Sequence, residues 1–175
     1  THGVERQAEL RSEASRAAER LVPSAPPRPG PKRARSPYLV QRLRQTPEEN
    51  LFNHVKFHLI KDAIEALPLA TPRILDLGCG LQVSRSYLDA LGLRFEYLGV
   101  DYEEAFGPDL VADLLDLASL PQRLPWSPEV VLVLDVLEHL HSDAEVLSDV
   151  LGSIHALMPE GAWIVLALPQ MYRLD

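Results

Sequence analysis

The sequence predicts an α/β fold in which helices cover both faces of an open, mainly parallel sheet. From residue 73 onward, apolar runs of strand length alternate with helical stretches. The runs at 73–78, 130–136 and 162–169 are apolar with little alternation, as expected for strands that helices cover on both faces. Because strands and helices alternate along the chain, parallel strands joined by right-handed crossovers are expected.

Particular residues mark each predicted helix and strand. The helix before the sheet is marked by Thr46 as an N-cap, Pro47 in its first turn and Glu49 closing a capping box, and Pro68 ends it. Its apolar positions at helical spacing are Leu51, Phe52, Val55, Leu59, Ala63, Ile64 and Leu67. Further strands are expected at 95–101 and 109–114, and further helices in VSRSYLDALG and SDAEVLSDVLGSIHALMPEG. The last helix begins with a capping box from Ser142 to Glu145 and carries an apolar stripe at Val146, Leu147, Val150, Leu151, Ile154 and Leu157.

The N-terminal quarter differs in composition from the rest. Residues 1–21 are rich in Ala, Glu and Arg and predict a basic helical segment. Residues 22–45 begin with six prolines in sixteen positions, which indicates a Pro-rich linker. A protein partner docking through residues 1–45 is therefore possible, and the folded domain is expected at 46–175.

Charge and cysteine content narrow the function classes. Residues 1–61 carry 12 Lys/Arg and 6 Asp/Glu and are basic. Residues 62–175 carry 5 Lys/Arg and 19 Asp/Glu and are acidic. An acidic domain repels phosphate backbones, which disfavours nucleic acid as a partner. No apolar run is long enough for a membrane span. A single cysteine, Cys79, and a charged N-terminus without a signal pattern predict a cytoplasmic protein.

The stretch RILDLGCGLQV (73–83) carries the candidate binding turn. Gly78-Cys79-Gly80 follows the first strand, where ligands bind in open α/β sheets. The second strand ends in Asp101, which is suited to accept hydrogen bonds from a ribose diol. The dinucleotide pattern G-x-G-x-x-G fails at Val83, and Asp76 would repel a phosphate but attract an ammonium group. An adenosine with a cationic tail is therefore favoured over NAD.

The ordered motifs ILDLGCG, YLGVDY, VADLLDL, VVLVLDVLEHL and LMPEGAWIVLALP resemble those of class I S-adenosylmethionine-dependent methyltransferases, over about residues 73–170. The resemblance implies a Rossmann-like fold, S-adenosylmethionine as cofactor and a small-molecule or glycolipid-type methyl acceptor. The cofactor-binding residues it implies are Asp76, Gly78, Cys79, Gly80, Asp101, Tyr102, Asp113, Leu114 and Asp135. Within this set, Asp76 and the glycine turn would hold the methionine part, with Asp135 on the same side. Tyr102 would lie beside the adenine, and Asp113 with Leu114 would meet its edge.

Methyl transfer requires the enzyme to position the acceptor against the methyl group and, for a hydroxyl or ammonium acceptor, to supply a base. His139 in DVLEHL is the candidate catalytic residue, because imidazole exchanges protons near neutral pH. A metal site is not expected. His54 and His58 are four residues apart, but the H-E-x-x-H pattern is not met. The E-x-x-E-H stretch of small-RNA 2′-O-methyltransferases has Asp135 at its first position here.

Two departures from the family pattern keep alternatives open. Gln82 stands where the family usually has a third glycine. The closing helix and antiparallel hairpin of the family do not occur before Asp175, so the domain is expected to be C-terminally incomplete. The alternative function is a catalytically inactive methyltransferase-like partner module, and a dehydrogenase comes third because the glycine spacing does not fit it.

Overall fold

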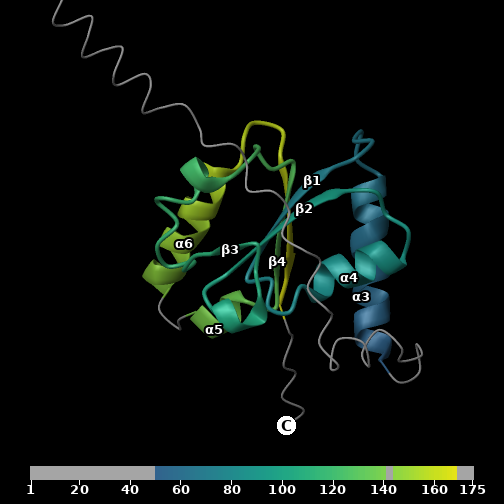
Figure 1. The fold of residues 1–175 in the computed structure, drawn as a ribbon, viewed down its shortest axis with the longest axis horizontal. Coiled ribbons are helices and arrows are strands. Elements are labelled where there is room, and N and C mark those ends of the chain that lie inside the picture. The colour runs from purple at the N-terminus through teal and green to yellow at the C-terminus, as the bar shows by residue number, and fades with distance from the viewer. Residues whose placement is uncertain (1–49, 141–143, 169–175) are drawn as a thin grey trace, which may run out of the picture. The chain divides into compact units, whose positions relative to one another are not determined.

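A five-stranded, all-parallel sheet forms the centre of the computed structural model, which describes residues 50–140 and 144–168 (Figure 1). All of these residues belong to one unit, Arg33–Asp175. The predictions for residues 1–21 and 22–45, and for the first residues of both capping boxes at Thr46 and Ser142, lie outside the described residues.

The sheet has the strand order β3-β2-β1-β4-β5. The strands are β1 (Arg73–Leu77), β2 (Glu96–Asp101), β3 (Leu110–Val111), β4 (Val130–Leu134) and β5 (Trp163–Ala167). On the central strand, Leu75 pairs with Leu98 of β2 and with Val131 of β4. The predicted parallel α/β sheet is confirmed, with all five strands parallel.

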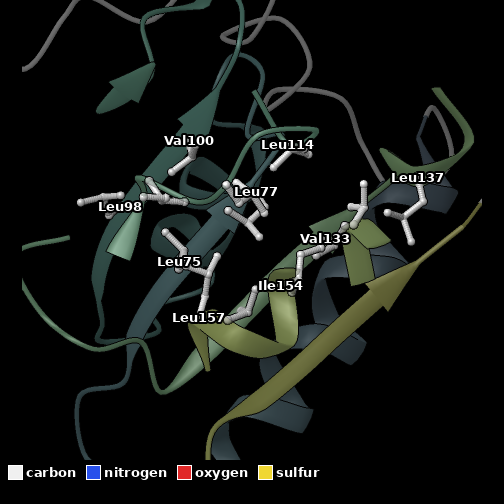
Figure 2. Close-up of a cluster of buried hydrophobic side chains, with 13 residues drawn as sticks. Leu75, Leu77, Leu98, Val100, Leu114, Val133, Leu137, Ile154 and Leu157 are labelled. Atoms are coloured by element: carbon white, nitrogen blue, oxygen red, sulfur yellow. The ribbon is translucent and has the colours of Figure 1, made fainter. Parts of the chain in front are cut away.

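One face of the sheet packs against α6 (Ala144–Leu157). Val150, Ile154 and Leu157 of this helix are buried in a cluster with Leu75 of β1 and Val133 of β4. Figure 2 shows Ile154 and Leu157 pointing toward these strand residues. Three of the six predicted stripe positions are therefore buried, whereas Leu151 is exposed.

The other face packs against α3 (Leu51–Glu65) and α4 (Val83–Ala90), which lie on the side opposite α6 in Figure 1. Phe57 and Tyr87 stack with ring centroids 4.6 Å apart, joining the two helices. Helices therefore cover both faces, as predicted. Each helix buries one stripe, which removes apolar area from water at about 25 cal/mol per Å².

Two details differ from the sequence prediction. The third strand has only two residues, because the chain leaves the sheet after Val111. Helix α3 begins at Leu51, with Asn50 as its N-cap, and not at the predicted Thr46 and Pro47. It ends at Glu65, three residues before Pro68, and buries Asn53, Phe57, Ile60 and Ile64. Of the apolar positions that predict the helix, Leu51, Phe52, Val55 and Leu59 are exposed. The apolar residues of α3 are distributed over most sides of the helix, so their spacing alone does not identify the buried face.

The carboxyl ends of the strands meet at one edge of the sheet, where the short helix α5 (Leu137–Leu140) follows β4. In Figure 1 this edge is at the bottom, and α3 begins at the same end. Short 3₁₀ turns at η1 (Glu104–Phe106) and η2 (Pro121–Arg123) lie in the connections after β2 and β3. Among the described residues, no helix has the length and apolar character that a membrane span requires.

Candidate functional site

The glycine turn after β1 has a backbone that favours glycine at both ends. Gly78 has φ +76° and Gly80 has φ +50°, in the left-handed region that residues with a Cβ rarely adopt. A Cβ on Gly78 would lie 2.4 Å from Cγ2 of Val136, whereas one on Gly80 would meet nothing within 4 Å. Gly78 is therefore required for packing against the β4 end, and Gly80 lies beside open space.

The turn has no free N–H group for a phosphate at its three central residues. Gly78 N and Cys79 N both donate to the carbonyl of Val100, at 2.8 and 3.0 Å. Gly80 N donates to Oδ2 of Asp101 at 2.8 Å. A pyrophosphate cradle needs unpaired backbone N–H groups at the start of a helix, so this turn does not suit a dinucleotide phosphate.

Asp101 links the glycine turn to the end of β2 through hydrogen bonds. Its Oδ2 accepts from Gly80 N, and its Oδ1 accepts from the N–H of Glu103 at 2.9 Å. The residue is 5% exposed. A carboxylate has about four acceptor positions, so two remain for a neighbouring diol. The structure thus joins two sequence-predicted residues, Gly80 and Asp101, in one arrangement.

Asp76 is a buried carboxyl group beneath this turn. It is 1% exposed, and Tyr97 donates its hydroxyl to Oδ2 of Asp76 at 2.5 Å. Burial raises the pKa of Asp76 to about 6, although hydrogen bonds from Tyr97 and Ser84 oppose this rise. Burial also raises the pKa of the Tyr97 hydroxyl, which keeps it a donor. Asp76 is therefore a carboxylate without a fully compensating charge.

Cys79 contributes its backbone to the turn while its side chain is in the interior. The thiol packs against Gly99, where an added Cβ would lie 2.8 Å from Sγ. Burial raises the pKa of the Cys79 thiol far above its usual range. The thiol is therefore protonated and does not suit nucleophilic chemistry.

Gln82 occupies the position of the family's third glycine without pointing into the turn. Its φ of 57° and ψ of 43° are left-handed, which explains why glycine suits this position. Its Nε2 donates to the carbonyl of Gly107 at 3.2 Å, and its Oε1 accepts from Arg85 at 3.2 Å. The side chain therefore links the turn to the loop after β2.

The residues predicted around an adenine lie in the connections after β2 and β3. Tyr102 is 73% exposed directly beyond Asp101. Asp113 is exposed, and its Oδ1 accepts from the N–H of Leu115 at 2.9 Å. The Leu114 side chain, in contrast, is part of the hydrophobic core (Figure 2). Of the predicted pair, only Asp113 presents its side chain to the outside.

Asp135 follows β4 with an unusual backbone and a partner that the sequence did not indicate. Its φ is 55°, and its N–H donates to the carbonyl of Ala167 at 2.8 Å. Oδ2 accepts from Nζ of Lys56 on α3 at 2.5 Å, whereas Oδ1 is buried without a hydrogen-bond partner. Lys56 lies 79 positions away in the sequence, so no local motif pointed to it. Tyr97 was also missed, because its contact with Asp76 depends on strand register.

His139 lies on α5 at the same edge of the sheet. Its side chain is 77% exposed, and its Nε2 is 3.8 Å from Oε1 of Glu138. This position leaves the imidazole accessible to a second molecule. Among residues 50–140 and 144–168, no three His, Cys, Asp or Glu side chains are grouped so that they could hold a metal ion.

Fold and site together define a class. A parallel sheet of order 3-2-1-4-5, with a glycine turn after the central strand and an acid at the end of the neighbouring strand, is a Rossmann-like arrangement. A model of the methyltransferase domain family matches residues 7–173. The chain belongs to this family.

Solved structures agree on the fold. The chain is similar to CalS10, an amino pentose methyltransferase from Micromonospora echinaspora solved with S-adenosylmethionine bound, at 18% identity and a TM-score of 0.54 over 67% of this chain and 51% of that one. It is also similar to the CurJ carbon methyltransferase, at 22% identity and a TM-score of 0.54 over 72% and 37% of the two chains. DesVI from Streptomyces venezuelae is similar at 18% identity and a TM-score of 0.51, over 69% of this chain and 52% of that one.

The chain thus spans about half the length of CalS10 and DesVI, and less of CurJ. A search among curated proteins gave no significant match.

Proposed function

We propose that this protein is an S-adenosylmethionine-dependent methyltransferase acting on a small-molecule or glycolipid-type acceptor. The observation that carries the proposal is the hydrogen bond from Gly80 N to Asp101 Oδ2. It brings the glycine turn and the acid at the end of β2 into one site. The membership of the methyltransferase domain family supports the same reading.

The residues present fit S-adenosylmethionine better than a dinucleotide. Asp101 retains acceptor positions for the ribose hydroxyls, and the exposed ring of Tyr102 offers a surface for the adenine. The N–H groups of Gly78, Cys79 and Gly80 are already paired, so these three groups do not serve a phosphate. Asp113 is exposed with one oxygen not used by Leu115, and an exocyclic amine suits it.

The methionine end of the cofactor would lie at the acids near β1 and β4. Buried Asp76 has a raised pKa because burial disfavours its charged form, and an ammonium group beside it would stabilise the charged form. Asp135 has a buried oxygen without a partner, which suits a second N–H donor. Both acids therefore favour a cationic group over a phosphate.

When bound, S-adenosylmethionine supplies a methyl group on a sulfonium, and the leaving thioether needs no acid. The protein has to align the acceptor and exclude water. His139, exposed on α5 beyond β4, would accept a proton from a hydroxyl or ammonium acceptor. The acidic character of residues 62–175 disfavours a nucleic acid in this role.

Calorimetric titration of the whole chain tests the proposal. S-adenosylhomocysteine, the stable demethylated product, and S-adenosylmethionine should bind with one-site stoichiometry, and NAD should bind at least tenfold more weakly, roughly the loss of one charge-assisted contact. Binding of neither sulfur ligand would support the alternative of an inactive partner module. A preference for NAD would overturn the choice of cofactor.

A further inference from the structure

Lys56 on α3 lies among the acids at the end of the site proposed for the methionine part. The side chain of Lys56 on α3 is 13% exposed, and its Nζ is 2.5 Å from Oδ2 of Asp135. The rings of Phe52 and Phe57 lie 5.0 and 5.1 Å from Nζ. Aromatic faces at this distance attract a cation. The ammonium group is therefore held at the edge of the sheet where β4 ends.

The surroundings of Lys56 contain more negative than positive charge. Besides Asp135, the Lys56 ammonium acts on Asp76 and lowers its pKa, while Asp101 raises it. Arg85 on α4, another cation, lies over the Tyr97 ring, donates to Gln82 and pairs with Asp109. The described part of the site thus combines the buried carboxyl groups of Asp76 and Asp101 and the half-buried carboxylate of Asp135 with the Lys56 ammonium.

This charge pattern is complementary to an α-amino acid. A zwitterionic tail has an ammonium group, which suits Asp76 and the unpartnered Oδ1 of Asp135, and a carboxylate, which needs a cation. Carboxylates bind ammonium groups through charge-assisted hydrogen bonds, which are stronger than neutral ones. Lysine has three N–H donors, so Lys56 retains donors after its bond to Asp135.

We propose that Lys56 binds the α-carboxylate of the cofactor's amino-acid tail. The proposal rests on the proposed function, because it assumes a ligand with such a tail. It assigns to α3 a part in cofactor binding that none of the glycine-turn and strand-end motifs contains.

The test compares ligands that differ only in the tail. S-adenosylhomocysteine has both charged groups, its decarboxylated analogue S-adenosyl-3-thiopropylamine has only the ammonium, and 5′-methylthioadenosine has neither. The proteins are the wild type, Lys56→Met, Lys56→Arg and the control Lys61→Met. Lys61 lies on the same helix and is also paired with a carboxylate, Glu65. Calorimetry gives each dissociation constant, and circular dichroism checks the fold.

Lys56→Met should weaken S-adenosylhomocysteine about 10- to 100-fold, the loss expected for a charge-assisted hydrogen bond. It should leave 5′-methylthioadenosine unchanged and should not weaken the decarboxylated analogue. The analogue's ammonium then meets Asp76 and Asp135 without a competing cation. Lys56→Arg should recover most of the affinity for S-adenosylhomocysteine, and Lys61→Met should behave as wild type.

Equal weakening of all three ligands by Lys56→Met would mean that Lys56 only supports the fold, and would overturn the proposal. No change for S-adenosylhomocysteine would overturn it as well. If Lys56→Met does not fold, the wild type decides, because S-adenosylhomocysteine should then bind at least about tenfold more tightly than its decarboxylated analogue. Failure of the wild type to bind S-adenosylhomocysteine at all would instead contradict the proposed function.

Discussion

Replacing Asp76 with asparagine should have opposite effects on stability and on ligand binding. Asp76 is 1% exposed, and burial raises its pKa to about 6 from an ordinary value of 3.8. Because the folded state binds this proton more tightly than the unfolded state, falling pH through 6 stabilises the fold through this group, and the gain is complete below 3.8. Above pH 6 the ionised carboxylate destabilises the fold.

The size of this effect follows from the two pKa values. At about 1.4 kcal/mol per pH unit, a rise from 3.8 to about 6 corresponds to about 3 kcal/mol of destabilisation at pH 7.5. Asparagine has nearly the same shape, carries no charge, and can still accept from Tyr97. Asp76→Asn should therefore raise the free energy of unfolding at pH 7.5 by about 1–3 kcal/mol and change it little at pH 4.

Binding should change in the other direction. If the ionised carboxylate holds the α-ammonium group, Asp76→Asn should weaken S-adenosylhomocysteine at pH 7.5 by about tenfold or more. In the wild type, about a tenth of Asp76 stays ionised at pH 5 if its pKa is about 6, so affinity should fall about tenfold there. Asp76→Asn should remove this pH dependence, which would assign it to Asp76.

Urea unfolding at pH 4 and 7.5 measures the first effect, and calorimetry at pH 5 and 7.5 measures the second. Asp116→Asn is the matched control, because Asp116 is exposed in the connection after β3 and should change neither quantity. The reasoning is refuted if Asp76→Asn is less stable than the wild type at pH 7.5. It is also refuted if this variant binds S-adenosylhomocysteine as tightly as the wild type.

Three further substitutions test other parts of the site. Gly78→Ala should lower the free energy of unfolding by about 2 kcal/mol or more, measured with urea, because its Cβ would clash with Val136 at a left-handed φ. Gln82→Gly should leave S-adenosylhomocysteine affinity within about threefold by calorimetry, because the Gln82 side chain bonds Gly107 and one such bond contributes only about 1 kcal/mol. A tenfold gain would mean that Gln82 obstructs the ligand. His139→Gln should slow methyl transfer about 100-fold in a radiolabel assay, as for loss of a general base, without altering S-adenosylhomocysteine affinity. An unchanged rate would exclude His139 as the base.

Much of the fold could be predicted because it depends on local pattern. Uninterrupted apolar runs such as Val130–Leu134 indicate strands covered on both faces. The place of Asp101 beside the glycine turn could also be predicted, because Asp101 ends β2 and β1 pairs along its whole length with β2. These features need only the order of residues along the chain.

The remainder depends on contacts between distant segments. The face that α3 buries could not be predicted, because Leu51, Phe52 and Val55 are as apolar as the residues that pack inside. The Lys56–Asp135 pair joins a helix to a strand end across the sheet edge, and its geometry follows from how α3 packs. The left-handed backbone at Asp135 is likewise set by its hydrogen bond to β5, which no local pattern indicates.

The central claim is that Asp101 and the glycine turn form a site for the ribose of S-adenosylmethionine. Its most direct test is a calorimetric cycle with S-adenosylhomocysteine and its 2′-deoxy analogue on the wild type and Asp101→Ala. The deoxy analogue should bind the wild type about tenfold more weakly, because a hydrogen bond to a charged acceptor is lost. Asp101→Ala should bind both ligands weakly and nearly equally, which separates the lost ribose contact from any change in the turn at Gly80. Asp101→Ala binding S-adenosylhomocysteine as tightly as the wild type would contradict the claim.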